Sequence, residues 1–332
     1  MKQDLLTRVV RLRMLRAAVC FAASMLTASM VAAQPPTDFS AVEIEILHVK
    51  GNVYALFGAG GNTTVQIGPA GVLVVDTQYA GISEKLIAAI RSLSDEPVRY
   101  VINTHVHGDH IGGNEALILA GATVTGGNVT RAIADAREGA KAIAHENVLL
   151  SLIEQEPPPP VAAWPTDTYV EGPRELFFND EAIQLIHQPD AHTNGDSLVY
   201  FRGSDVISTG DLFVTTSYPV IDLSRGGTLN GIIDALNNII AIAIPRDRQE
   251  GGTMIISGHG RIADEADVVE YRDMLTIIRD RMQYMIGEGM SLEAVKEARP
   301  TFDYDPRYGS DSGFWTTERF VEAAYRSLDD DS

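Results

Sequence analysis

The sequence predicts a mixed α/β fold, which some schemes would class as α+β. Hydrophobic residues make up 45% and charged residues 21% of the 332 residues, the ordinary balance of a globular protein. Short segments rich in Val, Ile and Thr, bounded by turns that contain Gly, are typical of strands. Longer segments with apolar residues three and four positions apart are typical of helices. The length allows one large or two medium domains to bury a core without disulfides.

The first half is predicted to begin with antiparallel hairpins. The turn Gly68-Pro69-Ala70-Gly71 separates two of the expected strands. In chain order we expect strands at 43–49, 52–57, 63–67 and 72–75, a helix at 83–93, strands at 98–103 and 122–125, and a helix at 129–153. The four prolines at 157–160 lack N–H donors, so residues 156–160 are expected to form a surface loop.

The second half is predicted to contain another run of strands, followed by helices. We expect strands at 169–176, 182–187, 197–201 and 205–209, a helix at 228–242, a strand at 254–257, and helices at 266–286, 291–299 and 316–327. The apolar stripes of the last three helices are typical of core contacts. Residues 34–262 are therefore expected to form the main domain, with 263–332 as a C-terminal helical extension packed on it.

Residues 1–33 have the layout of a secretory signal peptide. Five Lys or Arg and one Asp precede an uncharged run at 17–33. The short side chains of Val31-Ala32-Ala33 predict cleavage before Gln34. An uncleaved N-terminal anchor is the alternative. Both interpretations export the remainder of the chain, so we expect a periplasmic or secreted protein with no stable membrane anchor after cleavage.

Charge and cysteine content exclude several classes of function. The net charge is −19, and it becomes −23 without residues 1–33, which carry five Lys or Arg and one acid. This charge disfavours nucleic acid as a partner, and with it a nuclease activity. The single cysteine, Cys20, lies in the predicted leader, where its neighbours do not fit a lipid-attachment site. The mature chain is therefore expected to have no disulfide, no Cys nucleophile and no Cys metal ligand.

A candidate metal site lies in the six residues His105-Val106-His107-Gly108-Asp109-His110, directly after an expected strand. Imidazole and carboxylate are the ligands that Zn²⁺ takes when thiolate is absent. A solvated His-rich loop is the alternative. Three later segments also follow expected strands: His192-Thr193-Asn194-Gly195-Asp196, Gly210-Asp211 and Gly258-His259-Gly260. Since strand ends at one sheet edge can hold ligands rigidly, the four segments are expected to converge.

The order H-x-H-x-D-H, H-T-x-G-D, G-D and G-H-G resembles the metallo-β-lactamase superfamily over about residues 42–262. The segments Gly61-Asn62-Thr63-Thr64 and Val74-Val75-Asp76-Thr77 are similar to the opening motif of the family. The resemblance implies a four-layer αβ/βα sandwich of two similar halves. It also implies a dinuclear metal site between the edges of the two sheets.

Carried over to this chain, the resemblance implies a role for each candidate ligand. His105, His107 and His192 would hold one metal, Asp109, His110 and His259 the other, and Asp211 would bridge them. Two Zn²⁺ per chain are expected, because His stands at position 107 where the di-iron branch has Glu. Asp109 is the expected catalytic residue, orienting a hydroxide and accepting its proton. Asp76 is expected to hydrogen-bond ligands from behind, with simple turn capping as the alternative.

The implied function is a zinc-dependent hydrolase that uses a metal-bridging hydroxide to open an ester, lactone, thioester or β-lactam. A bridging Asp is more similar to the glyoxalase, lactonase and sulfatase branches than to the true β-lactamases. The alternatives are an iron-dependent oxidoreductase on the same fold and a non-catalytic periplasmic accessory protein.

A small-molecule substrate is expected. Arg225 is a candidate anchor for a substrate carboxylate, with a solvated surface charge as the alternative. The loops 57–62, 154–169 and 213–227 carry aromatic and apolar residues that suit an amphiphilic organic ligand. His48, His145 and His187 are expected to make ordinary polar contacts.

Overall fold

The structure is a computed structural model that describes residues 38–123 and 139–329. The predicted leader at 1–33, with its cleavage site and Cys20, lies outside these ranges. Among the described helices, none combines the length and apolar character needed to cross a membrane.

The described residues form two sheets. In the first sheet the neighbouring strands follow chain order: β1 (Glu45–Lys50), β2 (Val53–Phe57), β3 (Thr63–Gly68), β4 (Gly71–Val75), β5 (Val98–Ile102), β6 (Lys141–His145) and β7 (Asp167–Tyr169). The predicted hairpins are confirmed, since β1 to β4 pair antiparallel. The pairs β4–β5, β5–β6 and β6–β7 are parallel.

The second sheet is built from the later part of the chain. Its strands lie in the order β13 (Ile262–Ala263), β12 (Met254–Ile256), β11 (Val206–Ser208), β10 (Asp196–Phe201), β9 (Glu181–Gln188) and β8 (Arg174–Phe178). Four of these pairs are antiparallel, and β11–β12 is parallel. The parallel pair directs the ends of β11 and β12 to the same edge.

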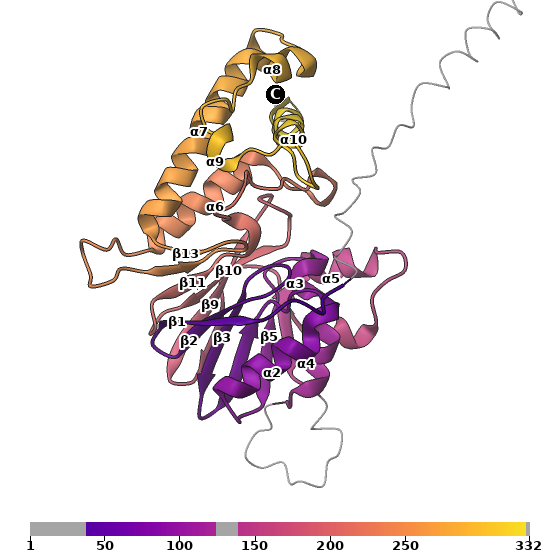
Figure 1. The fold of residues 1–332 in the computed structure, drawn as a ribbon, viewed down its shortest axis with the longest axis vertical. Helices are drawn as coiled ribbons and strands as arrows, with labels where there is room; N and C mark the ends of the chain where they lie inside the picture. The colour runs from indigo at the N-terminus through magenta and orange to yellow at the C-terminus, as the bar shows by residue number, and fades with distance from the viewer. Residues whose placement is uncertain (1–37, 124–138, 330–332) are drawn as a thin grey trace, which may run out of the picture. The chain divides into compact units, whose positions relative to one another are not determined.

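The described helices cover the outer faces of the sheets and continue into the C-terminal region (Figure 1). The α-helices are α2 (Ser83–Leu93), α3 (Gly108–Ile111), α4 (Asn114–Ala120), α5 (Glu146–Ile153), α6 (Leu229–Ile242), α7 (Glu265–Gly287), α8 (Leu292–Ala298), α9 (Asp305–Tyr308) and α10 (Thr317–Asp329). Short 3₁₀ turns lie at η1 (Ala80–Ile82), η3 (Val161–Ala163), η4 (Gly210–Leu212) and η5 (Leu223–Arg225).

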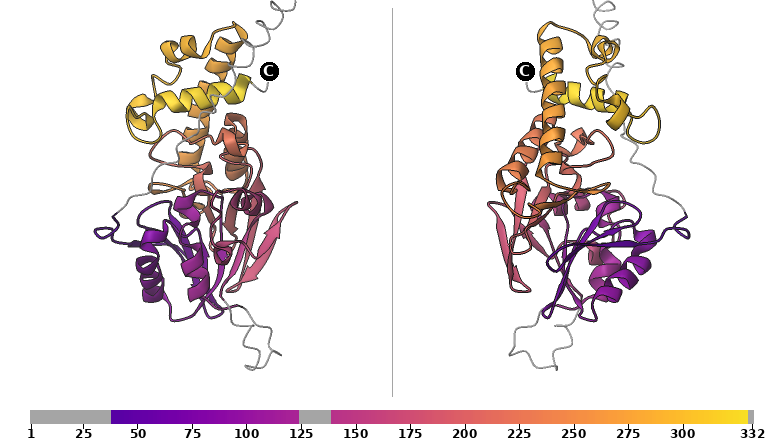
Figure 2. Two further views of the ribbon diagram at one scale, coloured as in Figure 1. Left: turned by 90° about the vertical axis from the view of Figure 1, so that its right-hand side faces the viewer. Right: turned by 60° about the vertical axis from the view of Figure 1, so that its left-hand side comes forward.

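Alternating side chains along the strands produce the predicted four layers (Figure 2). On β4, Val72 and Val74 pack against α2 and α4, whereas Leu73 and Val75 face the second sheet. On β12, Ile256 faces the first sheet and Ile255 packs with α6 and α7. The α/β class and the αβ/βα sandwich predicted from the sequence are confirmed.

The C-terminal helices share one hydrophobic cluster with the second sheet and α6. The cluster joins Leu198 and Ile207 of the sheet to Leu236 of α6, Tyr271 of α7 and Phe320 of α10. All five side chains are buried. Residues 330–332 of the predicted extension lie outside the described ranges.

The helix predicted at 129–153 is wrong in its described part. Residues 141–145 form β6, and only 146–153 are helical. β6 lies between β5 and β7 in the sheet, and Ala142, Ile143 and Ala144 are buried there. Pairing with distant strands therefore outweighs the local helical pattern. Residues 129–138 lie outside the described ranges.

Two predicted strands also need correction. The segment 169–176 is not one strand, because Gly172, at φ 67°, and Pro173 separate β7 in the first sheet from β8 in the second. This turn is the crossover between the sheets. Residues 122–123 are irregular, and 124–125 lie outside the described ranges. Helix α4, which the sequence analysis missed, is held by the burial of Leu117 and Ile118 under the first sheet.

Candidate metal centre

The four candidate segments follow four strands, as their positions in the sequence predicted. His105 follows β5, His192 follows β9, Asp211 lies in η4 after β11, and His259 follows β12. Asp109 and His110 lie on the short helix α3. The structure brings all seven candidate ligands together, in two groups of three with Asp211 between them.

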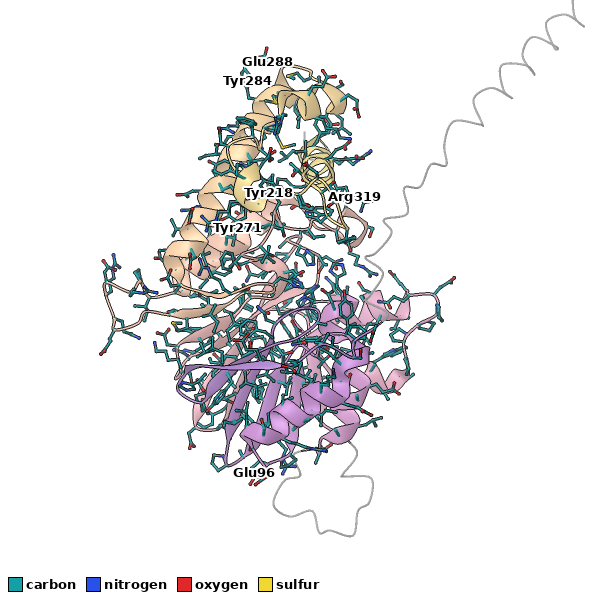
Figure 3. The ribbon with its side chains drawn as sticks, viewed as in Figure 1. Glu96, Tyr218, Tyr271, Tyr284, Glu288 and Arg319 are labelled. Carbon is teal, nitrogen blue, oxygen red and sulfur yellow. The ribbon has the colours of Figure 1, made fainter. Side chains whose placement is uncertain are left out.

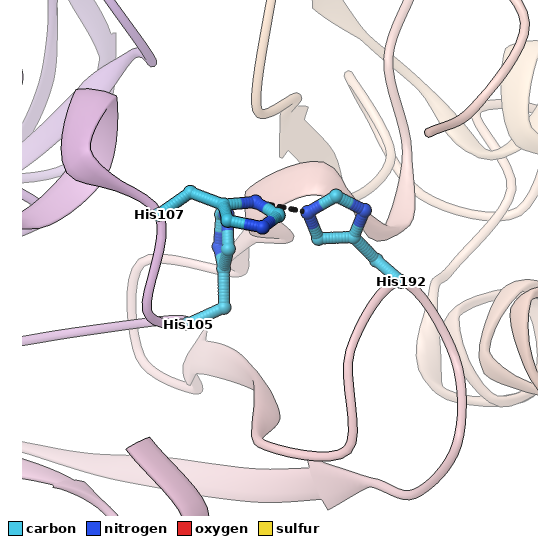
Figure 4. A group of neighbouring side chains, drawn as sticks. All are labelled: His105, His107 and His192. Carbon is cyan, nitrogen blue, oxygen red and sulfur yellow. Dashed lines mark hydrogen bonds between the residues drawn. The ribbon is translucent and has the colours of Figure 1, made fainter. Parts of the chain in front are cut away.

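The first group consists of His105, His107 and His192, whose ligand atoms all lie within 4.8 Å of one another. The rings of His107 and His192 meet edge to face, with His192 Nε2 2.8 Å from His107 Nδ1 (Figure 4). His105 and His192 are completely buried. The Nε2 atom of His105 is buried and has no hydrogen-bond partner among the described residues.

Outer contacts determine which nitrogen of each imidazole carries the proton. His107 donates from Nε2 to Asp222 Oδ2 at 2.9 Å, and His192 donates from Nδ1 to the Val220 carbonyl at 2.7 Å. His105 Nδ1 lies 3.0 Å from Thr104 Oγ1, whose own proton is donated to Asp76. The remaining nitrogen of each ring therefore carries a lone pair, which points toward the other two rings. Three converging lone pairs fit a cation, which would also satisfy the buried Nε2 atom of His105.

The second group consists of Asp109, His110 and His259, again with ligand atoms within 4.8 Å of one another. His259 Nε2 lies 3.2 Å from Asp109 Oδ2 and 3.3 Å from His110 Nε2. The second ring nitrogen of His110, Nδ1, donates to Asp76 Oδ2 at 2.7 Å. This mixture of imidazole and carboxylate suits a divalent ion such as zinc.

Asp211 lies between the two groups and presents one carboxylate oxygen to each. Oδ2 lies 3.8 Å from His192 Nε2, while Oδ1 lies 3.1 Å from His110 Nε2 and 3.4 Å from His259 Nε2. The side chain is 10% exposed. A carboxylate in this place is able to bridge two ions.

Two glycines leave the space that these side chains occupy. A Cβ atom at Gly258 would collide with Asp211 Oδ1, and one at Gly61 would collide with the ring of His110. Both backbone segments therefore approach the site as closely as only glycine allows. Both glycines stand within sequence motifs, but the steric reason for them depends on residues far away in the chain.

Asp76 lies behind both groups. Its carboxylate accepts hydrogen bonds from His110 Nδ1, from the Thr104 backbone N–H at 2.8 Å and from Thr104 Oγ1 at 2.6 Å. Thr104 in turn contacts His105. Asp76 thus contacts His110 directly and His105 through Thr104, and its supporting role toward a metal stays a prediction.

Asp222 and Val220 are the contacts that the sequence analysis missed. Both lie in an irregular stretch without a motif, so no local pattern marked them. Arg225, the candidate substrate anchor, instead has its Nε atom 3.4 Å from Asp222 Oδ2, with 28% of its side chain exposed. Its guanidinium is thus partnered within the protein, and its role toward a substrate stays a prediction.

Burial and neighbouring charges give the two groups different electrostatics. Burial, with the nearby imidazoles of His110 and His192, lowers the pKa of His105 well below its usual value. Burial and His107 lower the pKa of His192 to about 4. Although burial opposes it, Asp211 and Asp109 raise the pKa of His259 to about 9. His105 and His192 are therefore neutral near pH 7, the form in which imidazole binds a metal.

The carboxylates of the site are ionised, as ligands need to be. Burial alone would favour the protonated forms, but His259 and His110 hold the pKa of Asp211 well below its usual value. The same imidazoles lower the pKa of Asp109. Burial raises the pKa of Asp222, but the hydrogen bonds from His107 and Ser224 outweigh burial and lower this pKa to about 2.

The remaining three histidines make contacts away from both groups. His48 Nε2 lies 2.9 Å from the Gly51 carbonyl. The rings of His145 and His187 stack with centroids 3.6 Å apart, and they hydrogen-bond to the carbonyls of Val170 and Asn194. These are the ordinary polar contacts that were expected for the three histidines.

Comparison with known families gives one match over most of the chain. The family model described as the metallo-beta-lactamase superfamily matches residues 57–301. A linear primary-alkylsulfatase from a Pseudomonas sp. is 22% identical over 260 residues, which cover 69% of this chain and 48% of that protein. The chain thus spans about half the length of this curated relative.

Solved structures share the fold. The stereoselective inverting sec-alkylsulfatase Pisa1 from Pseudomonas sp. matches with a TM-score of 0.63 at 14% identity, covering 85% of this chain and 50% of that one. A metallo-beta-lactamase from Pontibacter korlensis matches with a TM-score of 0.52 at 16% identity, covering 70% of this chain and 99% of that one. At these identities the likeness is one of fold.

Proposed function

The chain belongs to the metallo-beta-lactamase superfamily, and from this premise we propose that it is a hydrolase whose two His/Asp groups each hold a zinc ion. The proposal rests above all on the first group, where outer hydrogen bonds leave three imidazole lone pairs converging on one point. Asp211, with one oxygen toward each group, supports a pair of ions over a single one. Two such ions would supply an activated water and polarise the bond to be broken.

The residues of the chain would orient the reactants and handle protons. Asp109 keeps 22% of its side chain exposed and is ionised, so it is able to orient a water molecule and accept its proton. His107 and His259 are the partly exposed histidines of the site, at 26% and 31%. His105, His110 and His192 are buried. A substrate therefore reaches the site from the side of His107, Asp109 and His259.

Tyr79, which the sequence analysis did not single out, borders the same carboxylates. Burial, together with the charges of Asp109 and Asp211, raises its pKa to about 12. A tyrosine hydroxyl is protonated at neutral pH even without this shift. A protonated phenol that is only half-buried is available to donate a hydrogen bond to a substrate oxygen.

Among the substrate classes considered, we favour an ester, and specifically an alkyl sulfate, over a lactone, thioester or β-lactam. The curated relative is an alkylsulfatase. The fold of Pisa1 covers 85% of this chain, whereas that of the β-lactamase covers 70%. A bridging Asp rather than Cys at position 211 also argues against a β-lactam as the natural substrate.

A panel of four substrates tests this function. We expect purified protein with two bound zinc ions to show its highest kcat/KM on an alkyl sulfate, measured as released sulfate, when compared with an acyl lactone, a thioester and a chromogenic cephalosporin. Dialysis against a chelator should abolish turnover, and added Zn²⁺ should restore it. Preference for another member of the panel would reject the substrate class.

Metal analysis separates the alternatives. Protein purified without added metal should contain close to two zinc and negligible iron per chain; mainly iron would favour the oxidoreductase. A full complement of zinc with no turnover on any of the four substrates would favour the non-catalytic accessory protein.

We also propose that the protein is exported to the periplasm or secreted, on the basis of the leader pattern at 1–33. In a Gram-negative host, mass spectrometry of the envelope fraction should find a chain that begins at or near Gln34. A cytoplasmic species that retains Met1 would contradict this proposal.

A further inference from the structure

We propose that the C-terminal helices position the metal ligands of the first group through one irregular segment, residues 215–222. Tyr271 and Trp315 are the positioning residues. The proposal rests on the proposed metal centre, and it assigns to the C-terminal helices a role in the site that their packing alone does not imply.

The 215–222 segment contains no helix or strand, yet much of it is buried. Buried irregular backbone needs hydrogen-bond partners, because its N–H and C=O groups cannot reach water. On one side these partners belong to the metal centre, and on the other side they belong to the C-terminal helices. The segment therefore connects the two regions.

On the side of the metal centre, the segment touches three of the ligands. The carbonyl of Val220 accepts the hydrogen bond from His192, and Asp222 accepts the one from His107. The backbone N–H of Asp222 donates to the His192 carbonyl at 3.0 Å. At the other end, the Thr215 N–H donates to the His259 carbonyl at 3.1 Å.

On the side of the helices, three aromatic residues hold the segment. The Tyr271 hydroxyl, from α7, donates to the Ser217 carbonyl at 2.9 Å. The Trp315 indole N–H, just before α10, donates to the Pro219 carbonyl at 3.1 Å. Tyr218 stacks on Phe320 of α10 with centroids 4.5 Å apart. Figure 3 labels Tyr271 of α7 and Tyr218 of the 215–222 segment.

Tyr218 also attaches the segment to α9. Its hydroxyl donates to the Thr301 carbonyl or to Asp305 Oδ1, at 3.2 and 3.1 Å, and its backbone N–H donates to the Tyr308 carbonyl at 3.2 Å. Tyr218 and Tyr271 are buried. The backbone from 217 to 219 is thus tied to the C-terminal helices immediately before Val220.

The position of this backbone matters for metal binding because it orients two imidazoles. An outer partner on the other nitrogen fixes the tautomer and the ring orientation of a ligating histidine, so loosening that partner lowers the affinity for the metal. For His192 that partner is a carbonyl of the segment, and for His107 it is a side chain of the segment. In the second group, the ring of His110 is held by Asp76 instead. Loosening the segment should therefore weaken the first metal more than the second.

Two matched Tyr→Phe variants test the proposal. Tyr271→Phe removes the hydrogen bond to the Ser217 carbonyl, whereas Tyr325→Phe removes one to the Met290 carbonyl, at 3.1 Å, within the C-terminal region. Trp315→Phe, alone and with Tyr271→Phe, loosens the segment at a second point. Co²⁺ titration with a competing chelator gives the affinity of each metal equivalent, and the visible Co²⁺ spectrum reports ligand geometry.

We expect Tyr271→Phe and Trp315→Phe each to lower the affinity for one of the two metal equivalents by roughly tenfold, which is the low end of the cost of losing an outer partner. Both variants should also shift the Co²⁺ spectrum. Tyr325→Phe should leave both equivalents and the spectrum unchanged. Wild-type affinities in both Tyr271→Phe and Trp315→Phe, or an equal effect of Tyr325→Phe, would overturn the proposal while leaving the proposed function intact. A wild-type chain that binds no metal would reject both.

Discussion

His107→Ala and His259→Ala are each expected to lose one of two metal equivalents and to lower turnover more than about 100-fold. His107 belongs to the first group and His259 to the second, so each substitution removes one ligand from a different ion. Loss of an outer partner alone costs roughly 10–100-fold in affinity or activity, and loss of a ligand should cost more. Atomic emission measures the metal, and the substrate panel measures turnover.

Both residues are suitable targets because they are the partly exposed histidines of the site, so alanine there leaves no large cavity in the core. His48→Ala is the matched control, since His48 hydrogen-bonds to Gly51 at the surface, away from both groups. It should retain both metal ions and full turnover. Two metal equivalents in either His107→Ala or His259→Ala would refute its assignment as a ligand.

Asp211→Asn is expected to lose most of one metal equivalent, whereas Asp211→Cys should retain metal. Asn keeps the shape of the side chain but removes the negative charge that faces His192 on one side and His110 and His259 on the other. Thiolate restores that charge and is itself a good zinc ligand. Equilibrium dialysis followed by metal analysis measures the stoichiometry of each variant.

Asp205→Asn is the control for loss of a buried carboxylate. Asp205 is also buried, but it accepts hydrogen bonds from Lys50, Gln249 and Thr253, away from the metal centre. The Asp205→Asn variant should bind two ions even if its free energy of unfolding falls. If Asp211 is only a turn residue after Gly210, Asn would serve nearly as well. Unchanged stoichiometry in Asp211→Asn would therefore reject the bridging role.

The candidate ligands could be identified from the sequence because most of them stand close together in the chain or next to predicted strands. Four of the seven candidate ligands lie within six residues, from His105 to His110, and the other three directly follow strands that their own residue patterns predict. The hairpins of β1 to β4 and helices such as α2, α6 and α7 were predictable for the same reason. Their turns, spacing and periodicity involve residues that are neighbours in the chain.

Tertiary structure decided the features that depend on residues far apart in the chain. Residues 141–145 became a strand because β5 and β7 pair with them, against their local helical pattern. The contact of His107 with Asp222 spans 115 positions, and that of Tyr271 with Ser217 spans 54. The sequence by itself therefore determined which residues are able to bind metal. How the imidazoles are oriented was decided only when the fold brought the 215–222 segment between the metal centre and the C-terminal helices, because hydrogen bonds between distant residues leave no local pattern.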